Sequence, residues 1–227
     1  MLSRIEYGKD LRDFVWKNVL PYICLVGIFT NAINFSIFSR IKSKNTIYKF
    51  FILHSAADFV YFLLSFVYFF LKYSLKMPSC SYIVNVIDLY LFSISTTALA
   101  FYLLLVEIMI AFKRLLIVLN LNQNVRVNFK SSTIVILFFS ILTQVPYMLT
   151  REIRTIQTNN SSEQSISDKL SCSVDSRFEI ERNAIYDTRS YRYASSFINL
   201  FRGVIAPAAL LSLNILLCYK YKREIRL

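Results

Sequence analysis

Residues 50–71 read FFILHSAADFVYFLLSFVYFFL. This stretch contains one acidic residue, Asp58, and no lysine, arginine, glycine or proline. At a rise of 1.5 Å per residue, a helix of this length crosses the ~30 Å hydrocarbon core of a bilayer. Apolar and polar residues do not alternate with a period of two, which excludes a strand of a membrane β-barrel. The stretch therefore predicts a transmembrane helix.

Four further apolar blocks predict the same structure. We expect these spans at Asn18–Ser39, Ile83–Phe112, Thr133–Leu149 and Ser195–Cys218, in addition to Phe50–Leu71. The third block is longer than a bilayer requires and is expected to tilt or to project beyond it, whereas the fourth is short. The predicted fold class is all-α, a transmembrane helix bundle that forms a single domain over residues 1–227.

Composition agrees with a membrane protein. Hydrophobic residues make up 56% of the chain, against about 45–50% in soluble domains. The net charge of +12 could indicate a nucleic-acid partner, but a soluble basic domain would not carry such long apolar blocks. We therefore expect the lipid bilayer, and no nucleic acid, as a partner.

The distribution of charge predicts the orientation of the chain. Residues 40–49, residues 113–132 and the tail after Cys218 together hold twelve basic residues and one acidic residue. The opposite side mixes both signs, with seven acidic residues between Glu152 and Asp187. Because basic residues accumulate in cytosolic loops, we predict an extracellular N-terminus and a cytosolic C-terminus. The membrane in which we expect the protein is the plasma membrane.

Two features of the predicted external side agree with this topology. Asn159 and Asn160 each begin an N-glycosylation sequon in the loop 150–194, although an unused polar loop would read the same way. Cys80 and Cys172 both fall in external connections. An oxidising exterior would allow a disulfide between them, and the alternative is two free thiols.

The sequence gives no indication of an enzyme. His54 is the only histidine, and no cluster of Cys, His or acidic residues surrounds it in the sequence, so a metal site is not expected. No Ser/His/Asp set, phosphate-binding glycine loop or catalytic carboxylate pair is recognisable, and no cofactor is expected.

Several motifs resemble those of the rhodopsin-like (class A) G-protein-coupled receptors, in a divergent invertebrate form. The stretches that carry the resemblance are Gly27–Asn31 with Ile37–Arg40, Leu53–Asp58, Phe112–Leu116, the Cys80 and Cys172 pair, and Pro207. The chain departs from the family pattern at three points. Thr30 stands where the family has a glycine beside the asparagine, and Lys113 stands where it has an acid. The fourth predicted span lacks the family's tryptophan.

The resemblance implies five of the seven helices of a serpentine receptor, truncated after the fifth, and a chain that does not activate a G protein alone. It also implies residue roles. Asp58 with Asn31 would form an ion-binding or switch site, Arg114 would couple to a heterotrimeric G protein, and Cys80–Cys172 would be the family disulfide. Asp58 could instead be a hydrogen-bonded structural residue, and Arg114 a cytosolic anchor beside Lys113.

Other polar residues in the spans also require an explanation, because ionisable groups are costly in hydrocarbon. Asp88 and Arg202 lie in the outer parts of their spans, where they could pair with each other or contact a charged ligand. Glu107 shares a helix face with Arg114 and could equally be a neutral residue bonded to a neighbouring helix. Cys218 is a candidate palmitoylation site or a core thiol.

Two functions follow from these observations. The resemblance implies a receptor for an extracellular peptide, chemosensory or other small-molecule ligand, which would signal by shifting a helix-packing equilibrium. The alternative is a small helical transporter or an accessory membrane subunit. Transporters favour internal repeats and helices broken by glycine or proline, whereas this chain has 3 Gly and 4 Pro and no evident repeat.

Overall fold

The structure, a computed structural model, describes residue 11 and residues 14–41, 46–74, 81–119, 128–156 and 177–224. Helices account for most of these residues, which confirms the predicted all-α class for the body of the protein. The elements up to the central helix are α2 (Leu20–Arg40), α3 (Thr46–Phe69), η1 (Phe70–Ser74), α4 (Tyr82–Val86), η2 (Ile87–Ile94) and α5 (Ser95–Val118). They are followed by α6 (Phe129–Leu142), α7 (Val145–Leu149), β1 (Arg151–Ile156), β2 (Arg177–Arg182), η4 (Ala184–Asp187), α8 (Arg189–Leu200), η5 (Phe201–Ile205) and α9 (Ala206–Glu224).

Prolines accompany two of the places where the long helices deviate from α-geometry. Pro207 has no N–H to donate to the carbonyl of Gly203, and the π-helical segment η5 ends two residues before it. Pro146 has the same effect on the fourth span, where a turn at Thr143 and Gln144 separates α6 from α7. Each span therefore continues past its proline, but the side chains that follow face other directions than in an uninterrupted α-helix.

Four helices are long and apolar enough to cross a membrane, at Phe14–Arg40, Thr46–Tyr73, Phe129–Leu149 and Arg189–Lys222. Large apolar side chains on their outer faces are exposed, for example Tyr22, Val26 and Phe29 on α2. A soluble protein rarely exposes so much contiguous apolar surface, whereas lipid covers it at no cost. These helices indicate a multi-pass protein embedded in a membrane.

The third predicted span differs from the other four. It is helical from Tyr82 to Val118, through α4, the π-helical η2 and α5, and it is not among the four helices above. α5 packs against α3, α6 and α9, so it forms the centre of the bundle. Its buried residues Tyr102, Val106 and Ile110 join Phe50 of α3 and Ile136 of α6 in the largest core cluster.

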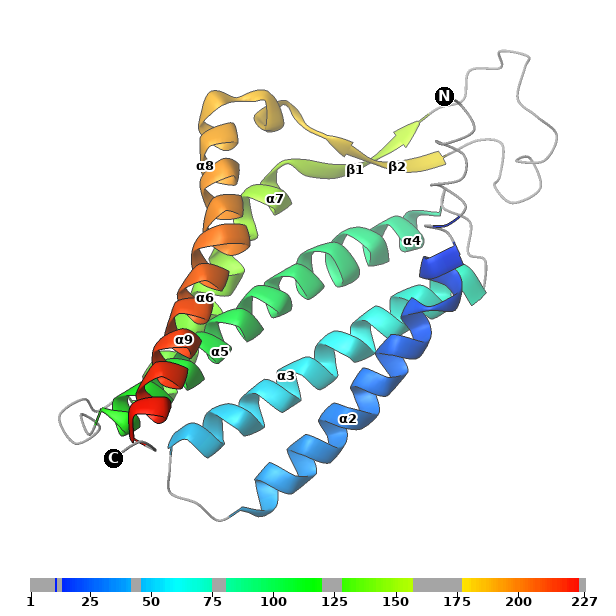
Figure 1. Cartoon of the computed structure of the whole chain (residues 1–227). Helices are drawn as coiled ribbons and strands as arrows, with labels where there is room; N and C mark the ends of the chain where they lie inside the picture. The colour runs from blue at the N-terminus through cyan, green and yellow to red at the C-terminus, as the bar shows by residue number, and fades with distance from the viewer. Residues whose placement is uncertain are drawn as a thin grey trace.

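The helices converge at one end of the molecule and spread apart toward the other (Figure 1). The convergent end holds the C-terminal ends of α2, α5 and α9 and the N-terminal ends of α3 and α6 (Figure 1). These are the ends that flank the basic segments of the sequence. The described helix ends next to the three basic segments therefore lie at the same end of the bundle (Figure 1).

A two-stranded antiparallel hairpin, which the sequence did not predict, occupies part of the segment expected to be a loop at 150–194. Arg151 pairs with Arg182 at its base, and Ile156 pairs with Arg177 at the far end of the described strands. The hairpin runs from α7 to the start of α4 at the spread end of the bundle (Figure 1). After it, the last helix begins at Arg189 rather than at the predicted Ser195.

Contacts at both ends hold the hairpin in place. At its base, Asn183 donates its side-chain amide to the carbonyl oxygen of Leu149 at 2.6 Å. Near the other end, Asn85 of α4 donates its amide to the carbonyl oxygen of Phe178 at 2.6 Å. The Phe178 ring also lies edge-on to Tyr82, with centroids 5.3 Å apart. The hairpin thus connects the end of α7 to α4 across the spread end of the bundle (Figure 1).

Candidate functional site

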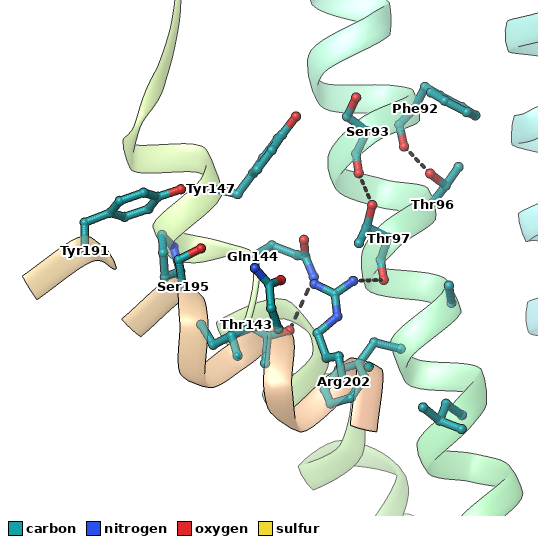
Figure 2. Close-up of a pocket in the computed structure, with 17 residues that line it drawn as sticks. Phe92, Ser93, Thr96, Thr97, Thr143, Gln144, Tyr147, Tyr191, Ser195 and Arg202 are labelled. Carbon is teal, nitrogen blue, oxygen red and sulfur yellow. Dashed lines mark hydrogen bonds between the residues drawn. The ribbon is translucent and has the colours of Figure 1, made fainter. Parts of the chain in front are cut away.

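A cavity of about 820 Å³ lies between η2 and α5, the α6–α7 junction, and α8 with η5. We call it the outer cavity, because it lies in the half of the bundle nearer the hairpin. The residues that line the cavity, drawn in Figure 2, include Thr97, Phe101, Gln144, Tyr147, Tyr191 and Arg202. Its volume falls within the roughly 300–1,000 Å³ typical of small-molecule sites.

Arg202 is the charged group of the outer cavity. It lies on the π-helical segment η5, is partly buried, and extends toward the backbone of α5 (Figure 2). Its Nη2 donates to the carbonyl oxygen of Thr97 at 3.4 Å, which is a long hydrogen bond. The guanidinium carbon also lies 5.4 Å from the centre of the Phe101 ring. No aspartate, glutamate or lysine is among the described residues that line the cavity.

The hydroxyl groups around Arg202 are mostly engaged by their own helices. Thr96 and Thr97 donate to the carbonyl oxygens of Phe92 and Ser93, one turn earlier. Thr143 donates to the carbonyl oxygen of Ser140 at 2.8 Å and accepts from the buried Gln144 amide at 3.3 Å. These bonds satisfy hydroxyls in an apolar environment and leave the guanidinium as the strongest donor group in the cavity.

Asp88 does not join Arg202 in the outer cavity, so one of the two predicted arrangements, a pair between them, is wrong. Asp88 lies on η2 and forms an ion pair with Lys72 of η1 at 3.3 Å. The Lys72 ammonium also donates to the Tyr68 hydroxyl at 2.5 Å. Lys72 follows directly after the predicted second span and therefore reaches the outer part of the bundle, where it neutralises Asp88.

A second polar cluster lies deeper in the bundle, between α3 and α5. The Nδ1 of His54 lies 2.9 Å from Asp58, and its Nε2 lies 3.2 Å from Glu107. His54 and Asp58 are about one-fifth exposed, whereas the Glu107 side chain is 46% exposed. The expectation that no acidic cluster surrounds His54 is therefore wrong. In the described part of the chain no group of three or more His, Cys, Asp or Glu residues could hold a metal ion.

Asn31 lies on α2, the helix that packs most extensively on α3, the helix of Asp58. Its side-chain amide donates to the carbonyl oxygen of Gly27 at 3.0 Å, within its own helix. At Gly27 itself the two helices approach so closely that a Cβ would lie 2.6 Å from the ring of Phe62. The hydrogen-bonding partner that the structure gives to Asp58 is thus His54, whereas Asn31 bonds to its own backbone.

Lys113 and Arg114 have different environments despite being neighbours. Lys113 is buried, with 5% of its surface exposed, whereas Arg114 is exposed. The Arg114 guanidinium lies over the ring of Phe51 on α3, 5.1 Å from its centre. Arg114 is therefore the one of the two that presents its charge at the convergent end of the bundle.

Four of the predicted site residues lie outside the described residues, namely Cys80, Cys172, Asn159 and Asn160. The proposed disulfide and the glycosylation sites therefore remain predictions. Of the other two cysteines, Cys24 is buried and Cys218 is exposed, and both are free thiols.

Sequence reasoning missed the partners of four predicted residues, Asp58, Glu107, Asp88 and Arg202. The contact of His54 with Asp58 could have been found, because residues four apart share one face of a helix. The contact of His54 with Glu107 joins residues 53 positions apart in two helices, so no local pattern indicates it. The same holds for Lys72 with Asp88 and for Arg202 with Thr97.

No protein-family model matches the chain, and a search of curated proteins found no relative. The resemblance to rhodopsin-like receptors therefore depends on the sequence motifs.

Proposed function

We propose that the chain is a receptor of the rhodopsin-like G-protein-coupled type that binds an extracellular ligand in the outer cavity. The observation that carries the proposal is the position of this cavity. It is lined by three separate segments of the bundle, at the end opposite the basic helix ends. A ligand bound there contacts α5 and α8 together, so it can favour one packing of these helices over another.

Two further observations support a signalling role. α5 runs from the neighbourhood of the cavity, at Thr97, to the convergent end, at Arg114, as one helix. A displacement of α5 at one end is therefore transmitted to the other by a rigid element. Arg114 would supply the contact to the G protein on the cytosolic side. The N-terminus would be extracellular, as the charge distribution predicts, and the protein would lie in the plasma membrane.

The experiment places an environment-sensitive dye on Cys218, which is exposed near the convergent end of α9. The protein in lipid nanodiscs is then titrated with peptide and small-molecule libraries. We expect a saturable change in dye emission that is abolished by Ala100→Trp, which fills the outer cavity, and that is absent in a Cys218→Ser labelling control. Transport of the same compound into sealed proteoliposomes would overturn the receptor function and favour the alternative transporter.

The G-protein part of the proposal has its own test. Peptides from the C-termini of G-protein α subunits are titrated against the protein, and at least one should bind saturably. Arg114→Ala should weaken this binding at least about tenfold, the effect of losing one charge-assisted hydrogen bond. Lys130→Gln, at an exposed cation at the same end of the bundle, is the matched control and should change it little. Equal binding by wild type and Arg114→Ala would remove Arg114 from this role.

A further inference from the structure

We infer that the outer cavity selects an anionic ligand, whose carboxylate or phosphate binds Arg202 and whose apolar or aromatic body fills the rest of the cavity. This inference rests on the proposed ligand-binding function of the same cavity and adds the chemical class of the ligand. It follows from the charge, hydrogen bonding and depth of Arg202, and from the nature of the cavity walls.

In the part of the chain that the structure describes, the charge of Arg202 has no counterion. Among the described residues Arg202 forms no salt bridge, and none of the described residues lining the cavity is acidic. Asp88, the acid expected to neutralise it, is paired with Lys72. Cations inside membrane helices normally pair with an acid or with backbone carbonyls, because isolated charges are costly there. A single long bond to the carbonyl of Thr97 is a weak substitute for an anion.

Among the described residues, most of the donor capacity of the guanidinium has no acceptor. It carries five N–H groups in a planar fork that matches the two oxygens of a carboxylate or phosphate. One of these groups is directed to Thr97, as the dashed line in Figure 2 marks. The hydroxyls of Thr97 and Thr143 donate to backbone carbonyls and do not compete for the same anion. An oxyanion in the cavity would therefore find a bidentate partner.

The walls of the cavity suit an apolar or aromatic body. Phe92, Phe101, Tyr147 and Tyr191 line it from three different segments of the bundle. Arg202 lies one helical turn below the cavity-lining residues Ile198 and Asn199 of α8, so an anion bound to it would leave the body of the ligand among the aromatic rings.

The depth of Arg202 identifies the side from which the ligand arrives. The axial rise from Arg202 to Lys220 is about 27 Å at 1.5 Å per residue. If Lys220 marks the cytosolic boundary, Arg202 lies near the outer boundary of the ~30 Å hydrocarbon core. Two sources of the anion are consistent with this depth, a soluble extracellular acid and the headgroup of an outer-leaflet lipid.

The experiment uses the full chain in a maltoside detergent free of phospholipid. Binding of 4-phenylbutyrate is compared by calorimetry with binding of 4-phenylbutyramide, which has the same shape but no charge. We expect the acid to bind at least about tenfold more tightly than the amide. Arg202→Gln should remove this difference, Arg202→Lys should retain part of it, and Arg192→Gln, an exposed arginine on α8, should retain all of it.

Equal affinity of acid and amide in the wild type overturns the inference, and this comparison needs no variant to fold. The absence of saturable binding of the acid overturns it as well. A competing titration with dihexanoyl phosphatidylglycerol separates the two sources. Displacement of the acid by this lipid supports a headgroup ligand, and its failure to compete supports a soluble acid.

The two proposals can fail separately. If the acid binds through Arg202 but leaves the Cys218 dye unchanged, the ligand class stands and the receptor function is wrong. If another, neutral compound produces the Cys218 signal while the acid does not bind, the receptor function stands and the ligand class is wrong.

Discussion

Replacing His54 by leucine tests whether the polar cluster between α3 and α5 stabilises the bundle. His54 is the link between the two acids, at 2.9 Å from Asp58 and 3.2 Å from Glu107. A neutral imidazole donates from one nitrogen and accepts at the other, whereas a protonated one donates from both. In His54→Leu both acids lose this partner, and Asp58 remains in an apolar span with little access to water.

The magnitude follows from the two contacts. A hydrogen bond to a charged group contributes about 1.5–3 kcal/mol when it is largely shielded from water, which applies to Asp58. The Glu107 contact should contribute only about 0.2–1 kcal/mol, the usual size for a hydrogen bond between membrane helices, because it is 3.2 Å long and 46% of that side chain lies outside the packed bundle. We therefore expect His54→Leu to lower the free energy of unfolding by about 2–4 kcal/mol.

The assay is a double-mutant cycle. Unfolding is followed by circular dichroism as the protein is titrated with sodium dodecyl sulfate in mixed micelles. His54→Leu combined with Asp58→Leu should show a coupling of about 1.5–3 kcal/mol, and combined with Glu107→Leu about 0.2–1 kcal/mol. Asp88→Leu is the distant control and should be additive with His54→Leu within about 0.5 kcal/mol. Additive effects of His54→Leu and Asp58→Leu would refute the reasoning.

Three other perturbations test the packing, the hairpin and the topology. Gly27→Ala should destabilise the protein by about 1–3 kcal/mol in the same titration, since its Cβ would lie 2.6 Å from the Phe62 ring; equal or greater stability, as helix propensity alone would give, contradicts this. Asn85→Ala removes the 2.6 Å hydrogen bond between α4 and the hairpin and should speed proteolysis of the hairpin about tenfold. If Asn85→Ala is cleaved no faster than an Asn128→Ala control, this hydrogen bond does not hold the hairpin in place. Cys218, exposed near the end of α9, should react with a membrane-impermeant maleimide only after cells are permeabilised, and labelling of intact cells would reverse the proposed orientation.

Much of the fold could be predicted from local sequence. The apolar blocks predicted helices that the structure contains, with boundaries within a few residues at Leu20–Arg40 and Thr46–Phe69. This succeeds because a backbone in hydrocarbon must satisfy its own hydrogen bonds, and a helix does so within one segment. The hairpin was not predicted, because its two strands are far apart in the sequence and are held by pairing with each other and by contacts to α4 and α7.

The sequence by itself determined which residues are costly in a membrane, namely Asp58, Asp88, Glu107 and Arg202. Only the tertiary structure decided their partners. Asp88 lies beside Lys72 rather than Arg202, and Glu107 lies beside His54. The physical reason is that hydropathy can be read along a single helix, whereas contacts between helices depend on the rotation of each helix about its axis and on its shift along that axis. Close packing sets the rotation and shift of each helix, as where Gly27 leaves room for the Phe62 ring. It also leaves Arg202 facing a cavity that has no acid among its described lining residues.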